Sequence, residues 1–163
     1  MYQFKSRIRY SETDETGRLS VPGIINYMQD CSTFQSEDGR MGISYLKEHH
    51  RAWLLSGWRI VIDRYPKLGE EITAGTWHCG SKGFYGYRDF VLLDQENNPL
   101  VRANSLWFFY DTAKKYAGAY PARRYPSLRN TAAVSGSGRS TQKDSHSGEI
   151  RNSSSCSDRP SSS

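Results

Sequence analysis

A single carboxylate has the best placement for chemistry in this sequence. Asp14 lies in the polar stretch SETDETGRLS, directly before a segment that carries a helix-start pattern. A carboxylate at that place could act as a nucleophile or general base toward a thioester carbonyl. The free N–H groups at the start of the helix could stabilise the oxyanion that develops. The alternative is an ordinary aspartate in a polar turn, and both interpretations stay open at this stage.

The remaining reactive side chains argue against other chemistries. Cys31 falls among apolar helix positions, where burial raises the pKa of a thiol, so we expect it to fill the core. His78 and Cys79 are neighbours in a strand-like run, so their side chains point to opposite faces and cannot easily share a metal. No Cys-x-x-Cys, His-Glu-x-x-His, Gly-x-Ser-x-Gly or Gly-rich phosphate motif occurs. We therefore predict no metal and no cofactor.

One long helix must position Asp14. Ser20 can cap it, Pro22 suits its first turn, and Gly39 can end it after Asp38. At the helical repeat, Gln35 and Asp38 fall within an apolar stripe, where a polar side chain needs a partner, a water or a function. For Asp38 the simpler explanation is a helix end emerging into solvent. The apolar members of the stripe are Ile24, Tyr27, Met28, Cys31 and Phe34.

The rest of the first 115 residues has the pattern of an antiparallel sheet. Strand-like runs are separated by short polar connections, which indicate hairpins. The order of strand, helix and four further strands predicts an α+β domain with the hotdog fold, in which one long helix is wrapped by a curved antiparallel sheet. The predicted strands cover residues 2–10, 51–65, 70–80, 83–94 and 100–111, with a helical turn at 43–50 and a polar turn at 95–99.

We expect an apolar cleft between this helix and the sheet. Its depth depends on which large side chains point inward together. Arg88 interrupts an aromatic strand beside Asp89, so it either faces outward or makes a bidentate contact with an anion. The substrate-binding candidates are Met28, Phe34, Gln35, Trp53, Trp58 and Arg88.

The composition changes after the predicted domain. Residues 122–163 contain thirteen serines and carry 7 Lys+Arg against 3 Asp+Glu, whereas residues 1–121 carry 15 against 14. Such a segment buries too little apolar surface to offset the entropy of ordering it. We predict a hotdog domain over residues 1–115 and a disordered tail over 116–163. The basic charge is concentrated in the tail, so nucleic-acid binding is not supported.

The sequence also bears on location. No apolar run approaches the roughly 20 residues that a membrane-spanning helix needs. The N-terminus has no signal pattern, and three cysteines are too sparse for a disulfide framework. We therefore expect a cytoplasmic protein.

Three stretches resemble the acyl-acyl-carrier-protein (acyl-ACP) thioesterases of bacteria and plants: LSVPGIINYMQDCS, AWLLSGWRIVIDRYPKLGEEITAGTW and YRDFVLLDQENNPLVRANSLWFFYD. The resemblance implies hydrolysis of acyl-ACP in fatty acid biosynthesis, with release of a free fatty acid. It also implies two hotdog domains, of which the first shapes the acyl pocket and the second carries a catalytic Asn-x-His motif.

No Asn-x-His occurs in the 163 residues. We interpret the break in pattern as a reading frame or gene model lost between Lys115 and Arg129. Since hotdogs normally pair, a hotdog without its partner domain is expected to self-associate. The pattern Tyr10-x-x-x-Asp14-x-x-Gly17 also resembles the loop of the 4-hydroxybenzoyl-coenzyme A thioesterases. That alternative implies a single-hotdog acyl-CoA thioesterase in which Asp14 is the catalytic carboxylate.

Overall fold

The structure is a computed structural model that describes residues 1–118. Strands are its commonest secondary structure, and two α-helices and one short 3-10 helix connect the first two strands. In chain order the elements are β1 (Tyr2–Arg7), η1 (Tyr10–Glu12), α1 (Val21–Asp38), α2 (Ile43–Glu48), β2 (Arg51–Ile62), β3 (Glu71–Lys82), β4 (Tyr85–Leu93), β5 (Pro99–Asp111) and β6 (Tyr116–Ala117).

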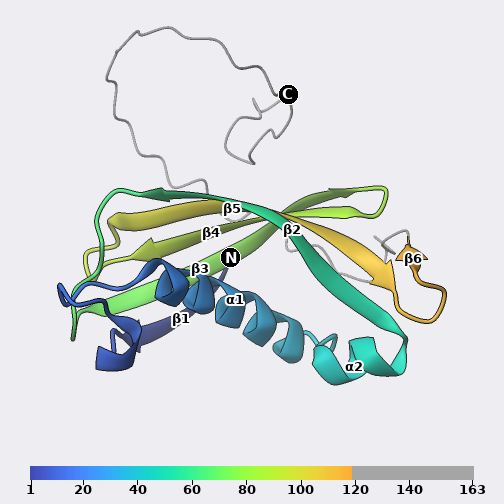
Figure 1. Ribbon diagram of the computed structural model, residues 1–163, viewed down its shortest axis with the longest axis horizontal. Coiled ribbons are helices and arrows are strands. Elements are labelled where there is room, and N and C mark those ends of the chain that lie inside the picture. Colours follow the sequence, from blue (N-terminus) through green and yellow to red (C-terminus); the bar gives the residue numbers. More distant parts are fainter. Residues whose placement is uncertain (119–163) are drawn as a thin grey trace, which may run out of the picture.

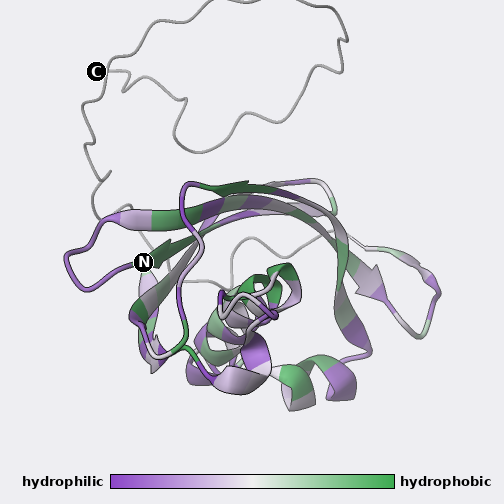
Figure 2. Ribbon diagram, turned by 60° about the vertical axis from the view of Figure 1, so that its left-hand side comes forward, coloured by the Kyte–Doolittle hydropathy of each residue, from purple (hydrophilic) through white to green (hydrophobic). Residues whose placement is uncertain are grey.

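The strands form one antiparallel sheet in the order β1-β3-β4-β5-β2, with β6 paired to the end of β5. The sheet arches, and α1 lies in its concavity, with α2 on the same side (Figures 1 and 2). The predicted architecture of one helix wrapped by a curved antiparallel sheet is therefore confirmed. The first strand ends at Arg7 and not at Tyr10, because the chain there turns into η1.

Local signals set the ends of α1 as the sequence predicts. The Ser20 Oγ accepts a hydrogen bond from the Gly23 N–H at 3.1 Å, Pro22 lies in the first turn, and Gly39 follows the last helical residue. The apolar stripe is buried except at Phe34, which is 44% exposed and packs edge-on against Phe4.

The core fills the space between α1 and the concave face of the sheet. Helix side chains interlock there with alternate residues of the central strands, as expected for a sheet buried on one face. The fully buried members include Ile24, Met28, Cys31, Phe90, Leu92 and Val101.

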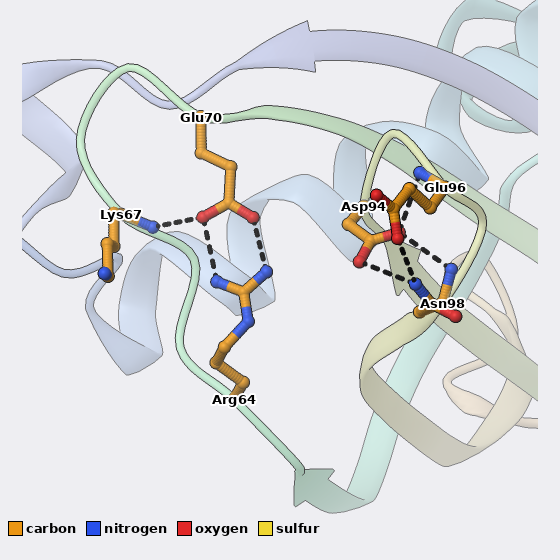
Figure 3. A network of polar contacts seen from close by, with 6 residues as sticks. All are labelled: Arg64, Lys67, Glu70, Asp94, Glu96 and Asn98. Carbon is orange, nitrogen blue, oxygen red and sulfur yellow. Dashed lines mark hydrogen bonds and ion pairs between the residues drawn. The ribbon is translucent and has the colours of Figure 1, made fainter.

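Polar contacts fix the turns at the end of the sheet away from α2. The Arg64 guanidinium donates two hydrogen bonds to the Glu70 carboxylate, at 2.6 and 3.0 Å, and so closes the loop between β2 and β3. The Asp94 carboxylate accepts the backbone N–H groups that follow it, which confirms the predicted polar turn between β4 and β5. Figure 3 shows both clusters, formed by Arg64, Lys67, Glu70, Asp94, Glu96 and Asn98.

Strand pairing continues slightly beyond the predicted boundary at residue 115. Tyr116 and Ala117, which the sequence analysis assigned to the tail, pair with Asp111 and Tyr110 as β6. The remainder of the predicted tail, 119–163, lies outside the described residues, as does most of the predicted loss of frame. Among the described helices, none is both long and apolar enough to cross a membrane.

Candidate functional site: a cleft between the helices and the sheet

A cleft of about 1030 Å³ lies between the C-terminal half of α1, the short helix α2 and the concave face of the sheet. Its apolar walls come from α2 and from two tryptophans of the sheet. Among residues 1–118, no carboxylate lines it, whereas five basic or imidazole side chains do. The lining residues are Ser32, Thr33, Ser36, Gly42, Ile43, Leu46, Lys47, His50, Arg51, Ala52, Trp53, His78, Ser81, Gly86, Tyr87, Arg88, Trp107 and Thr112.

The strand register places four side chains in one row across the sheet. His78 on β3 is opposite Arg88 on β4, Arg88 is opposite Ser105 on β5, and Ser105 is opposite Trp58 on β2. Residues directly opposite each other in adjacent strands share a face of the sheet. The row therefore faces α1. The Ser105 Oγ is used within the sheet, since it donates to the Arg88 carbonyl at 3.0 Å and accepts from the Trp107 indole N–H at 2.7 Å.

Arg88 connects the sheet to α1. Its Nη1 donates to the Gln35 Oε1 at 2.5 Å and to the Thr76 Oγ1 at 3.1 Å. The outward-facing interpretation of Arg88 is therefore wrong, because the β3–β4 register turns this side chain toward the helix. Gln35, which the sequence placed in the apolar stripe, is 9% exposed. The partner that a buried amide needs is this arginine.

His78 lies on the cleft wall beside this arginine. Its Nε2 is 3.0 Å from the Ser81 Oγ. Burial of the ring, and to a smaller degree the charge of Arg88, lower the pKa of the imidazole below its ordinary value. The neutral form of His78 is therefore favoured near neutral pH.

An ion pair lies beside the cleft where β2 begins. The Arg51 Nη1 lies 2.5 Å from the Asp111 Oδ2, and the Asp111 Oδ1 accepts the backbone N–H groups of Ala113 and Lys114. Asp111 is 3% exposed. These contacts hold the start of β2, and with it the connection to α2, against the end of β5.

The structure divides the remaining predicted substrate-binding residues into two groups. Trp53 lines the cleft and packs against Phe109, with ring centroids 4.9 Å apart. Met28 and Trp58 belong to the core or pack against it, and Phe34 faces away toward β1; none of the three lines the cleft.

Asp14 lies in a turn in which nearby residues supply its hydrogen-bond partners. Its Oδ1 accepts hydrogen bonds from the Thr16 hydroxyl at 2.7 Å and from the backbone N–H groups of Thr16 and Arg18. The Thr16 hydroxyl, followed by the Arg18 N–H, lowers the pKa of this exposed carboxyl. Asp14 precedes the N-terminus of α1, whereas the cleft borders the C-terminal half, and Asp14 does not line it. A role for Asp14 in catalysis stays a prediction.

Cys31 has the environment that the sequence indicated. Its thiol is fully buried, with Sγ 3.5 Å from the Ala74 carbonyl oxygen, and burial raises its pKa to about 12. Among residues 1–118, no group of three or more His, Cys, Asp or Glu is arranged to hold a metal ion.

Sequence reasoning missed the contribution of His78, Trp107 and α2 to the cleft. A two-residue hairpin turn separates Lys82 from Tyr85, which pair with each other. Counting back from this pair along both strands, one residue at a time, would set His78 opposite Asp89. A bulge between His78 and Gly80, where Gly80 has φ +145°, shifts the register by one and brings Arg88 into the row.

Comparisons with known proteins agree with this architecture. The family model described as acyl-ACP thioesterase N-terminal domain matches residues 1–120. A chloroplastic palmitoyl-acyl carrier protein thioesterase of Gossypium hirsutum is 24% identical over 107 residues, covering 61% of this chain and 26% of that protein.

Solved structures share the fold at low identity. A putative oleoyl thioesterase from Lactobacillus plantarum superimposes with a TM-score of 0.73 at 20% identity, covering 85% of this chain and 57% of that one. A 1,4-dihydroxy-2-naphthoyl-CoA thioesterase from Synechocystis gives 0.68 at 10% identity, covering 74% of this chain and 90% of that one. The chain thus spans about a quarter of the cotton relative and somewhat more than half of the Lactobacillus protein.

Proposed function

The chain belongs to the acyl-ACP thioesterase family through its match to the N-terminal domain of that family, and we propose that these residues form the acyl-binding domain of an acyl-ACP thioester hydrolase. The substrate is an acyl chain carried on acyl-carrier protein. The product of the complete reaction is a free fatty acid.

The cleft is the observation that carries this proposal. A volume of about 1030 Å³ is at the upper end of the range for small-molecule sites, about 300–1,000 Å³. Ile43, Leu46, Trp53 and Trp107 supply apolar surface for an alkyl chain. Lys47 lines the cleft and no carboxylate of residues 1–118 does so, which suits an anionic carrier.

Hydrolysis needs a group that activates water and donors for the oxyanion. The resemblance implies that a second hotdog domain carries the catalytic Asn-x-His motif, and that motif does not occur in the 163 residues. We therefore expect the chain to bind acyl-ACP and to hydrolyse it at background rate. Turnover should appear when a C-terminal hotdog domain of the family is joined to it.

A titration with a palmitoyl-ACP analogue whose thioester is replaced by a thioether tests acyl binding directly. We expect the acylated carrier to bind more tightly than the unacylated one. Leu46→Glu, which places a carboxylate in the cleft, should remove that difference, whereas Leu68→Glu, at a 49% exposed position outside the cleft, should preserve it. Equal affinity for both carriers would refute the proposal.

A second candidate function is a self-sufficient acyl-CoA thioesterase that uses Asp14. The observation in its favour is an exposed carboxylate in the loop before α1. The helix start offers few donors beside it, because Pro22 has no N–H and Ser20 occupies that of Gly23. Hydrolysis of acyl-CoA by the purified chain, abolished in Asp14→Asn and retained in Glu15→Gln, would support this candidate; background turnover would exclude it.

We also propose that the domain pairs with a second hotdog through β2. This strand is at the end of the strand order and exposes Leu54, Leu55 and Val61, and an apolar strand at a sheet edge favours pairing. Sedimentation of the chain would detect self-association, which Leu55→Lys should weaken. A cytoplasmic location stays a prediction.

A further inference from the structure

Two turns at the α2 end of the sheet lie side by side and expose aromatic rings. The Phe109 N–H donates to the Phe84 carbonyl of the β3–β4 turn at 2.8 Å, and the Phe109 carbonyl accepts from the Gly118 N–H, directly after β6, at 2.9 Å. Figure 1 shows this turn, the β5–β6 turn and α2 at the same end of the molecule. Phe84, Tyr85 and Tyr116 are 37%, 36% and 51% exposed there.

Basic side chains accompany these rings. Lys82 directly precedes the β3–β4 turn, Lys114 and Lys115 lie in the β5–β6 turn, and all three are exposed. No carboxylate occurs in residues 81–87 or 112–118. The rings and the lysines together form one surface, which we call the hairpin-tip surface: Lys82, Phe84, Tyr85, Lys114, Lys115 and Tyr116.

The connecting segments also differ in charge between the two ends of the sheet. Those at the α2 end are 39–50, 83–84 and 112–115, and those at the opposite end are 8–20, 63–70 and 94–98. The first set carries four Lys or Arg against one carboxylate, a net of +3, and the second carries four against seven, a net of −3. Glu37 and Asp38, which end α1, reduce this difference without reversing it. Such a separation of charge turns the α2 end toward a negatively charged partner.

We propose that the hairpin-tip surface places the domain against an anionic lipid bilayer. Aromatic side chains favour the headgroup level of a membrane. Each Lys or Arg near an anionic lipid surface strengthens binding by about fivefold. Peripheral binding combines buried apolar area with this electrostatic attraction, and the hairpin-tip surface supplies both.

The arrangement of the rings favours a bilayer over an acidic protein. Interfaces between proteins pack as densely as protein interiors, so a protein partner would need matching pockets for side chains exposed on two separate turns. Lipid headgroups rearrange around such side chains. Ser81 and Thr112, next to the two turns, line the cleft, so a fatty acid released from it would leave beside the bilayer. That consequence rests on the proposed function, whereas the membrane contact does not.

The test is co-sedimentation of the purified 163-residue chain with vesicles of phosphatidylcholine alone or with about one-third phosphatidylglycerol. We expect binding to the anionic vesicles only, and its loss at about 1 M salt, where the Debye length is about 3 Å. Lys82→Glu with Lys114→Glu should lower the partition coefficient by more than about 25-fold. Phe84→Ala with Tyr116→Ala, which leaves the charge unchanged, should lower it by roughly tenfold.

Matched controls change the opposite end of the sheet. Arg18→Glu with Lys67→Glu alters the net charge by the same amount at two exposed positions. It should change binding little, because α1, with 18 residues, is about 27 Å long, several times the Debye length of about 8 Å at physiological salt. Tyr10→Ala, at an 83% exposed ring of that end, should bind like the unaltered chain. Circular dichroism confirms that each variant is folded.

The outcomes decide between the possible partners. Equal binding to neutral and anionic vesicles, or binding to neither, overturns the inference. Unchanged vesicle binding by the folded hairpin-tip variants overturns it too, because basic residues elsewhere, such as those of 122–163, would then account for the binding. If those variants instead bind the thioether acyl-ACP analogue more weakly, the surface docks the carrier. The vesicles contain no acyl-ACP, so a failure of the proposed acyl binding and a failure of the membrane contact are separate results.

Discussion

Replacing Met28 separates a core role from a substrate-binding role. The side chain is 1% exposed within the main hydrophobic cluster and does not line the cleft. Met28→Ala removes buried methylene groups and leaves a cavity that the neighbouring helix and strands fill only in part. Such truncations cost about 2–5 kcal/mol, a large share of the roughly 5–15 kcal/mol that stabilises a typical domain.

Thermal unfolding followed by circular dichroism measures this effect. A loss of this size should lower the melting temperature by about 10–20 °C. Ile43→Ala is the control, because Ile43 is 65% exposed and its truncation should barely change the melting temperature. Met28→Asp should prevent folding, since a carboxylate would be buried without a partner.

Ligand affinity then distinguishes the two roles. At a temperature where Met28→Ala is folded, its affinity for fatty acid should equal that of the unaltered chain. A variant that melts like the unaltered chain but binds fatty acid several-fold more weakly would refute the core assignment. It would make Met28 a cleft residue.

Three shorter predictions concern other parts of the domain. A Cβ at Gly86 would stand 3.0 Å from the Trp53 ring, so Gly86→Ala should shift that ring and alter tryptophan fluorescence and fatty acid affinity, whereas Gly57→Ala, in open space, should alter neither. The pKa of Asp111 is lowered by backbone N–H groups of the turn after β5 and then by Arg51. The ionised carboxylate therefore stabilises the fold fully above about pH 4, the pKa of an unfolded aspartate, and this stabilisation is lost as the pH falls through the lower pKa of the folded state. Melting curves against pH should show this loss, and Asp111→Asn should reduce it. The Cys31 thiol, with its pKa raised to about 12, should resist iodoacetamide at about pH 8 in the folded chain and react after unfolding, as peptide mapping can show.

The parts of the fold that local signals determine could be predicted from the sequence. Ser20, Pro22 and Gly39 set the ends of α1 through capping and backbone preference, which act over a few residues. Period-two alternation and polar turns likewise indicated the five main strands.

The cleft depended on features that the sequence pattern does not encode locally. The bulge beside Gly80 changes which residue of β4 faces α1, and a shift of one residue exchanges inward and outward side chains. Phe34 and Met28 both fall in the apolar stripe, yet one is 44% and the other 1% exposed. The difference follows from how α1 sits under the arch, which periodicity alone does not give.

The strand order has a consequence for how the domain assembles and opens. The strands β3, β4 and β5 follow one another as two hairpins. In contrast, β2 pairs with β5, which comes three strands later, and β1 pairs with β3 across the whole helical region and β2. Contacts between segments distant in sequence carry the larger loop-closure cost and form later. Amide hydrogens of β4, with strands on both sides, should therefore exchange most slowly with solvent, and those of β2 sooner. Since β2 and α2 form one wall of the cleft, an entering chain passes an edge strand, which opens more readily than a strand paired on both sides.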